Sequence, residues 1–491
     1  MLSEVIWLLA AILLVFKTVT MYLRGSKEKQ PPGPVPLPIL GNILSLSNKP
    51  HLNLTEMAKT YGKVFQIYLG SKRVIVVNDG NLAKEILVKQ GADFAGRPYV
   101  YSGTLYSNNG KSIGFADYTP VLKLQRKICQ KAMNMLSKEE DVICREIEQM
   151  AKIIESMEGK PYDPHFHIGL VVVNVLCGNN FSTTYELEDN EFRQIIAMNS
   201  TFADTLTGNP ADIFWWLKFI PTDKLRRLRQ AVKYKDQLIS RHFEEHKKTF
   251  DENNIRDLLD ALIKAKKEVE LEDSQTAKDL TDEHVKEAVM DTFVAGAEAT
   301  TAALRWIILY LIRHPEVQTN VQEELDKVIG RDRLPRLSDR KNLNYLEAVI
   351  NETLRISAQT PLGVPRMCTR DTNIGEYHVP KGTTVTLNMW AIHHDPSVWE
   401  NPMKFDPTRF LDLNENIVTS SSTSGFLPFS LGRRSCLGEN TARSIIFLFL
   451  AQILHRFRFD SLPGQHAPSD EHTPTLVLSP LPYQVNITRR E

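Results

Sequence analysis

Helical spacing of apolar residues dominates the chain. The longest such pattern runs from Thr281 to His314 and stops at Pro315, with two acidic residues directly after the threonine. Thr281 is a suitable N-cap, acidic residues favour the first turn, and proline ends the helix. At 1.5 Å per residue this helix is about 50 Å long. Because residues 302–312 are largely apolar, we expect it to cross the interior of a large helical domain.

Short runs rich in β-branched residues interrupt the helical pattern. They cover residues 73–77 (RVIVV) and 383–387 (TTVTL), and such runs are typical of strands. The charged stretch from Lys264 to Asp279 is predicted to be a solvated loop, and residues 437–454 are predicted to be a helix. The predicted fold class is mainly α with small peripheral β-sheets.

The N-terminus carries the most continuous apolar run. Residues 5–16 are unbroken, and apolar residues continue to Leu23 past a single lysine. Since a membrane-spanning helix needs roughly 17–25 residues, residues 1–24 are predicted to form a transmembrane anchor. Three basic residues between positions 24 and 29 place the body in the cytosol by the positive-inside tendency. The alternative is a buried N-terminal helix.

A proline-rich segment separates the predicted anchor from the rest of the chain. Residues 31–38 (PPGPVPLP) favour a stiff, extended conformation, and basic residues precede them. Residues 25–38 are therefore predicted to be a basic and proline-rich hinge. No repeat and no clear boundary follows, so residues 39–491 are predicted to form one large domain.

Charge and cysteine content exclude several classes of protein. Lys+Arg 59 balances Asp+Glu 59, which gives no support for a nucleic-acid partner. The 5 cysteines are few, odd in number and scattered, which favours a reducing compartment over a disulfide framework. Neither a CxxC pair nor an HExxH motif occurs, so no zinc site is predicted.

One cysteine lies in an unusual loop, FSLGRRSCLG at residues 429–438. The predicted helix that follows places Cys436 near a helix N-terminus, where the macrodipole favours a thiolate. Gly432 and Gly438 allow either close approach of a bulky partner or a positive φ, and Arg434 suits a carboxylate. These features fit a haem iron in a propionate-bearing ring. The alternative is a buried structural cysteine.

The spacing Phe429-x-x-Gly432-x-Arg434-x-Cys436-x-Gly438 resembles the haem-binding motif of the cytochromes P450. Residues 352–355 (ETLR), 407–410 (PTRF) and 295–301 (AGAEATT) resemble further motifs of that family, in the family's order. The resemblance covers essentially the whole chain and implies the cytochrome P450 fold, with haem b and a membrane anchor. It implies these cofactor-binding residues: Arg97, Arg126, Arg366, Phe429, Arg434, Gly438 and Cys436, the last as the iron ligand.

The resemblance also assigns a structural network and a substrate pocket. Glu352, Arg355 and Arg409 would form a buried, charge-assisted network that braces the haem side of the fold. At Leu122 the family usually has a tryptophan that binds a propionate, so one donor is missing here. The implied substrate pocket contains Asn199, Ala295, Gly296 and Val364, with an exposed helix asparagine as the alternative for the first.

The central helix departs from the family pattern beside its acidic residue. The resemblance implies Glu298 and Thr300 as catalytic residues, but Ala299 stands where a threonine usually helps to deliver protons. Thr300 lies roughly 100° further around the helix and cannot simply replace it. Three explanations remain open: a substrate hydroxyl or water supplies the proton, activation leaks peroxide, or the chain is an isomerase or dehydratase.

Within the microsomal group, two sets of segments point to different relatives. Residues 91–98, 107–109 and 115–117 resemble the steroid 17α-hydroxylase/17,20-lyase group. Residues 208–212 and 328–340 are more similar to the aryl-hydrocarbon hydroxylases.

The predicted function is a haem-thiolate monooxygenase of the endoplasmic reticulum membrane that oxidises a small hydrophobic substrate, a steroid by preference. Its implied partners are membrane lipid and P450 reductase, which passes on electrons from NADPH, with cytochrome b5 as a further candidate. A basic surface for the reductase would contain Lys123, Lys127, Lys131 and Arg433. The alternatives are an isomerase or dehydratase that uses no NADPH, an aryl-hydrocarbon or xenobiotic hydroxylase, and a non-catalytic haem- or steroid-binding protein.

Overall fold

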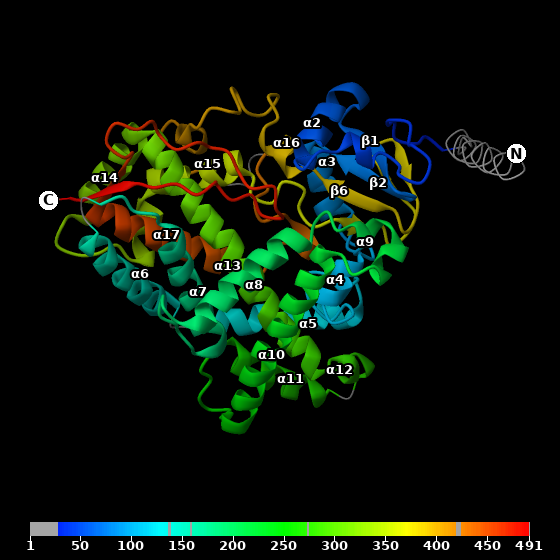
Figure 1. The fold of residues 1–491 in the computed structure, drawn as a ribbon, viewed down its shortest axis with the longest axis horizontal. Helices are drawn as coiled ribbons and strands as arrows, with labels where there is room; N and C mark the ends of the chain where they lie inside the picture. The colour runs from blue at the N-terminus through cyan, green and yellow to red at the C-terminus, as the bar shows by residue number, and fades with distance from the viewer. Residues whose placement is uncertain (1–27, 136–138, 158–159, 273, 419–423, 491) are drawn as a thin grey trace, which may run out of the picture.

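The computed structural model describes residues 28–135, 139–157, 160–272, 274–418 and 424–490. The predicted anchor, residues 1–24, and hinge residues 25–27 lie outside the described residues. Helices make up most of the described body, and the main sheet lies to one side of them with α2, α3 and α16 (Figure 1).

The structure has these α-helices: α2 (Pro50–Tyr61), α3 (Gly80–Lys84), α4 (Tyr101–Tyr106), α5 (Pro120–Met135), α6 (Glu139–Ser156), α7 (His165–Phe181), α8 (Asn190–Thr205), α9 (Pro210–Ile213), α10 (Asp223–Thr249), α11 (Leu258–Glu270), α12 (Gln275–Asp279), α13 (Asp282–Arg313), α14 (Pro315–Ile329), α15 (Asn344–Ser357), α16 (Met389–His393) and α17 (Glu439–Arg456). Shorter helical turns are η1 (Ile43–Ser45), η2 (Glu85–Lys89), η3 (Trp215–Phe219), η4 (Leu337–Asn342), η5 (Pro407–Phe410) and η7 (Gly432–Arg434).

Three small sheets complete the fold. The largest has the strand order β1-β2-β6-β3, in which β2 pairs antiparallel with β1 and parallel with β6, and β3 pairs antiparallel with β6. Two further sheets of the described residues are antiparallel pairs, β4 with β5 and β7 with β8. The strands are β1 (Val64–Leu69), β2 (Lys72–Val77), β3 (Arg366–Met367), β4 (Thr372–Ile374), β5 (Tyr377–Val379), β6 (Thr384–Leu387), β7 (Phe457–Asp460) and β8 (Asn486–Arg489). The predicted fold class, mainly helical with small sheets, is confirmed.

The long central helix forms as predicted. Thr281 caps α13 through a reciprocal hydrogen-bond pair with His284, and the helix ends at Arg313, directly before His314 and Pro315. Among the described helices, α13 is long and apolar enough to cross a membrane, but 72% of its most apolar window is buried in the protein. It packs against α5, α7, α15 and α17, so it is the core helix of the domain.

The prediction of a solvated loop from Lys264 to Asp279 is wrong. Residues 264–270 form the second half of α11, and residues 275–279 form α12. The reason is packing: Ala265, Val269 and Ala277 are buried at helical spacing, although lysines and glutamates surround them in the sequence.

Candidate active site

The loop before α17 holds Cys436 in a defined position. Its main-chain N–H donates to Phe429 O at 3.0 Å, and the Gly438 N–H points at its sulfur. Gly438 is the N-cap of α17, so the helix starts two residues later than its predicted start, and the sulfur lies just outside its first turn.

Two opposing effects act on the pKa of the Cys436 thiol. Burial raises its pKa, and this outweighs the lowering by the Gly438 N–H and by Arg126. The N–H at the helix start thus favours the thiolate, and desolvation opposes it. A bound metal cation would reverse the balance, since a coordinating thiol is deprotonated outright.

Several residues of the cysteine loop and of α13 are accessible or face open space. Cys436 is exposed although burial raises its pKa, so its sulfur faces an internal space rather than the outer surface. A Cβ added at Gly438 would meet no atom within 4 Å. Ala295 is exposed in the middle of the core helix, and Val364 is 44% exposed. This arrangement leaves room for a cofactor beside the sulfur and for a ligand along α13.

The two glycines of the cysteine loop have different roles. Gly432 has a φ of +71°, and a Cβ there would lie 1.9 Å from the main-chain oxygen of Leu87 in η2. The absence of a side chain at Gly432 therefore allows the cysteine loop to pack closely against η2. Gly438 has the ordinary φ of −90° and faces open space, so it is the glycine that leaves room for a bulky partner.

Four arginines from distant parts of the chain converge near this loop, and their guanidinium groups are held mainly by main-chain carbonyls. Arg97 donates from Nε to Gly114 O at 2.8 Å and from Nη1 to Pro365 O at 2.9 Å. Arg434 donates to Ala95 O, Ile113 O and Ala116 O at 2.8, 3.1 and 2.6 Å. Arg126 donates to Ser435 O at 2.8 Å and Arg366 to Ser430 Oγ at 3.1 Å.

This cluster carries uncompensated positive charge. Burial and the neighbouring guanidinium groups lower the pKa of Arg366 and of Arg434 to about 10, and they also lower the pKa of Arg97. Within the described residues, the carboxylate recorded beside these four is Asp117, whose Oδ1 accepts the main-chain N–H of Arg97. Buried cations need anions, and two propionates would supply them. The donor set therefore fits haem b.

Phe429 and Leu122 complete this side of the site. The Phe429 ring lies 4.9 Å from the Arg443 guanidinium. Leu122 is 1% exposed on α5, one turn before Arg126, and packs in the main core cluster. It offers no hydrogen-bond donor where the family usually has tryptophan.

The structure brings Glu352, Arg355 and Arg409 together. Arg355 binds Glu352 with two hydrogen bonds of 2.6 and 2.7 Å, and both side chains are 0% exposed. Arg409 Nε lies 3.4 Å from Glu352 Oε1, which also accepts the main-chain N–H of Asp406 at 2.9 Å. Arg355 Nη1 donates to His393 O at 2.9 Å. The glutamate therefore joins α15 to the segment around η5.

The predicted catalytic residues occupy different sides of α13. Glu298 is partly accessible; burial raises its pKa, and Arg305 opposes that effect. Thr300 is 3% exposed, so its side chain packs away from the interior space. A Cβ at Gly296 would lie 3.2 Å from Leu176 of α7, so this glycine serves helix packing, whereas Ala295 borders the open space.

Asn199 on α8 is not the exposed helix residue that the alternative expected. It is 3% exposed, and its Oδ1 has no hydrogen-bond partner among the described residues. Buried polar atoms are normally paired, so an unpaired carboxamide oxygen is a suitable contact for a ligand.

Two residues beside the site were missed by the sequence analysis. In the orientation that satisfies both ends of its amide, Gln359 donates to Ala299 O at 3.3 Å and accepts from Ala303 N at 3.1 Å. Asp291 on α13 accepts the main-chain N–H of Gly114 at 2.9 Å. No local motif marks either residue, because each acts on a segment far away in the sequence.

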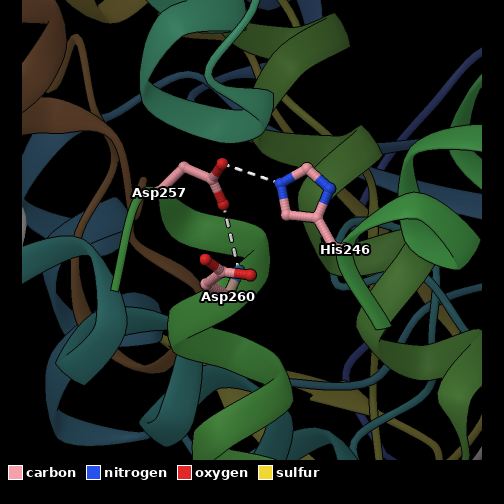
Figure 2. Close-up of side chains that lie close together, drawn as sticks. All are labelled: His246, Asp257 and Asp260. Carbon is pink, nitrogen blue, oxygen red and sulfur yellow. Dashed lines mark hydrogen bonds and ion pairs between the residues drawn. The ribbon is translucent and has the colours of Figure 1, made fainter. Parts of the chain in front are cut away.

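A separate group of possible metal ligands comprises His246, Asp257 and Asp260 (Figure 2). His246 Nε2 lies 2.8 Å from Asp257 Oδ2, which also accepts from Ser182 Oγ at 2.7 Å. Both carboxylate oxygens of Asp260 accept from Arg256, at 2.6 and 2.9 Å. Since these acceptors are already used, the group ties α10 to α11 rather than offering an open ligand set.

Comparison with known proteins matches the geometry. The sequence model of the family "Cytochrome P450" covers residues 31–487. The chain is 41% identical to steroid 17-alpha-hydroxylase/17,20 lyase of Ictalurus punctatus, covering 95% of this chain and 93% of that protein. It is 37% identical to cytochrome P450 1A1 of Platichthys flesus, covering 88% and 86%. A solved zebrafish cytochrome P450 with progesterone aligns with a TM-score of 0.81 and 35% identity, over 89% of this chain and 99% of that chain. A zebrafish structure with abiraterone aligns with a TM-score of 0.80, also at 35% identity, over 91% and 100%.

Proposed function

The chain belongs to the cytochrome P450 family and is a haem b monooxygenase, and we propose that it hydroxylates a steroid in the manner of a 17α-hydroxylase. The observation that carries the site assignment is the convergence of four arginines, three of them buried and Arg126 partly buried, near the loop of one cysteine. The first relatives are steroid hydroxylases that match along nearly the whole chain, which supports the steroid.

The haem would be held from two sides. Cys436 would be the iron ligand, and Arg97, Arg126, Arg366 and Arg434 would bind the propionates. Bound haem b supplies oxygen activation. The protein fixes the ring, because main-chain carbonyls orient three of the four guanidinium groups.

The substrate would lie along α13 between apolar walls and one polar contact. Ala295 and Val364 offer apolar surface, and Asn199 offers a buried amide oxygen without a partner. A flat, apolar ligand with one polar end fits this set. The zebrafish structures with progesterone and abiraterone support the same ligand class.

Glu298 would hold and release the proton that oxygenation consumes. Its carboxyl is partly accessible and its pKa is raised by burial, so it keeps a proton closer to neutral pH than an ordinary glutamate does. Thr300 is buried on another side of α13 and would support the helix there. Because Ala299 carries no hydroxyl, water or a substrate hydroxyl would complete the path.

Electrons would come from NADPH through P450 reductase, with cytochrome b5 as a second donor. Lys123, Lys127, Lys131 and Arg433 are exposed. Lys123 Nζ lies 4.7 Å from the centre of the Tyr118 ring, and Arg433 Nη1 donates to the Tyr118 hydroxyl at 2.8 Å. This basic surface would attract an acidic partner protein.

The body would sit in the cytosol on the endoplasmic reticulum membrane, attached by an anchor at residues 1–24 and a hinge at residues 25–38, with the catalytic domain at 39–491. An exposed apolar patch supports this placement, because Ile39 lies beside residues 213 and 214 around Gly70. Exposed apolar patches that contain tryptophan are typical of membrane-facing surfaces. The exposed apolar residues of these two segments are Val35, Leu37, Ile39, Leu44, Trp215, Trp216, Phe219 and Ile220.

The test is reconstitution of the full chain with reductase, NADPH and progesterone. We expect a hydroxylated steroid to form in step with NADPH loss. NADPH loss that ends in peroxide would contradict efficient proton delivery past Ala299. Turnover of planar aryl hydrocarbons but not of steroids would instead favour an aryl-hydrocarbon hydroxylase. No NADPH use, with carbon monoxide binding to reduced haem intact, would favour the isomerase or dehydratase that Ala299 keeps open.

A further inference from the structure

A carboxylate on the core helix lies behind the arginine cluster. Asp291 Oδ2 accepts the main-chain N–H of Gly114 at 2.9 Å. The Ile113 N–H and the Tyr106 side chain are further partners of the same carboxylate. Asp291 therefore holds the tip of the segment between α4 and α5 against α13.

The main-chain carbonyl oxygens of the same two loop residues accept hydrogen bonds from two of the arginines. Gly114 O accepts from Arg97 Nε at 2.8 Å, and Ile113 O accepts from Arg434 Nη1 at 3.1 Å. The peptide group that joins Ile113 to Gly114 thus donates its N–H to Asp291 and accepts from Arg434. Hydrogen bonds in such a chain polarise one another, so the carboxylate strengthens the carbonyl as an acceptor.

Other contacts of this loop act on residues next to the Ile113–Gly114 peptide rather than on the Gly114 N–H. Lys111 O accepts from Gln125 Nε2 of α5 at 2.8 Å, and Ala116 O accepts from Arg434 Nη2 at 2.6 Å. Phe115 N and Ala116 N make local turns with Ser112 Oγ and Ser112 O, at 3.2 and 3.1 Å. Gly114 also lacks a side chain. Within the described residues, the link recorded from the Gly114 N–H to a rigid element is the one to Asp291.

We propose that Asp291 is a positioning residue of the haem site: through the Ile113–Gly114 peptide it fixes Arg97 and Arg434, and with them the propionate side of the ring. This inference rests on the proposed propionate role of those arginines. It assigns a haem-retaining function to a residue that acts through the hydrogen bonds of a main-chain peptide group.

The test compares haem retention in variants of the full-length holoprotein. Asp291→Ala should transfer haem to apomyoglobin about tenfold or more faster than wild type, the size expected for losing a hydrogen bond to a charged group. Asp291→Asn keeps an acceptor oxygen and should lie in between. Reduced carbon monoxide spectra should show more absorbance at 420 nm, at the expense of 450 nm, in the same order.

Asp212→Ala is the matched control. Its carboxylate also accepts a main-chain N–H and a hydroxyl from a nearby segment, both from Ser102, at 2.7 and 2.6 Å. No hydrogen bond recorded among the described residues links that segment tip to Arg97 or Arg434. Asp212→Ala should lower the unfolding temperature to a similar extent but leave the haem-transfer rate unchanged.

A second comparison separates positioning from general destabilisation. In a background with Arg97→Lys and Arg434→Lys, Asp291→Ala should change the transfer rate less than about twofold, because its effect runs through those side chains. Equal haem loss in the two aspartate variants, or a full effect in the lysine background, would overturn the proposal. If Asp291→Ala does not fold, Asp291→Asn against Asp212→Asn carries the same comparison. Failure of wild-type protein to hold haem would instead refute the site assignment itself.

Discussion

Two glycines in the cysteine loop should respond in opposite ways to the same substitution. In Gly432→Ala the new Cβ would lie 1.9 Å from Leu87 O, at a φ of +71°. Restoring an ordinary contact requires about 1.5 Å of movement between η7 and η2. The left-handed conformation costs about 1–2 kcal/mol and the overpacking about 1–3 kcal/mol, so we expect a loss of about 2–5 kcal/mol in the free energy of unfolding.

Gly438→Ala should leave the fold intact and impair haem binding. The residue has a φ of −90° and a ψ of 13°, and its Cβ would meet no atom within 4 Å. Alanine fits this backbone, so the free energy of unfolding of the apoprotein should change by less than about 1 kcal/mol. The methyl group would enter the space beside the Cys436 sulfur. We expect haem loss at least about tenfold faster than in wild type, because overpacking costs about 1–3 kcal/mol.

Urea unfolding followed by circular dichroism on apoprotein measures the first effect, and haem transfer to apomyoglobin measures the second. Gly432→Ala should lower the urea midpoint with or without haem. Gly438→Ala should alter only the holoprotein. If Gly438→Ala holds haem as wild type does, the open space beside the sulfur is not the place of the ring. If Gly432→Ala is as stable as wild type, the contact with η2 is not as tight as the structure has it.

Three further outcomes are expected. Glu298→Gln cannot release a proton, so product per NADPH should fall about tenfold or more while peroxide rises; unchanged coupling would exclude the proton-delivery role. Burial lowers the pKa of His393 to about 3, so protonation of the unfolded chain below pH 6.5 should cost about 2 kcal/mol of stability by pH 5. His393→Gln can still accept the Leu427 N–H and should flatten this dependence in urea midpoints measured at pH 7 and pH 5. Lys127→Glu combined with Lys131→Glu should weaken reductase binding about tenfold at low salt, less at high salt, with haem content unchanged; equal affinity would place the reductase elsewhere.

Local signals in the sequence were sufficient for the elements that carry the site. The N-cap at Thr281 and the proline after His314 delimit α13 within one residue at each end. The apolar run before the C-terminus likewise predicts α17, displaced by two residues because Gly438 acts as the cap. These features are fixed by neighbours in the chain, so periodicity and capping rules recover them.

Contacts between distant segments decide what the sequence could not show. Val269 is surrounded by lysines and glutamates in the sequence, which suggests a loop. Its burial in the structure shows why this segment is a helix instead. At Cys436 the helix start favours the thiolate through neighbours in the chain, and burial by distant segments opposes it. Asp291 belongs to no local motif, because its hydrogen-bond partner is a glycine 177 residues earlier in the chain.

The departure at Ala299 shows how such a contact changes the interpretation of a motif. By the family pattern, the missing hydroxyl leaves α13 with one polar group fewer beside Glu298. The structure places the Gln359 amide on the Ala299 carbonyl and the Ala303 N–H, at 3.3 and 3.1 Å. A side chain that inserts into the main-chain ladder of a helix bends or widens it locally. The turn that lacks the hydroxyl therefore receives another polar group, the Gln359 amide, from a segment 60 residues away. Ala299 alone is weak support for the hypothesis that this protein does not activate oxygen.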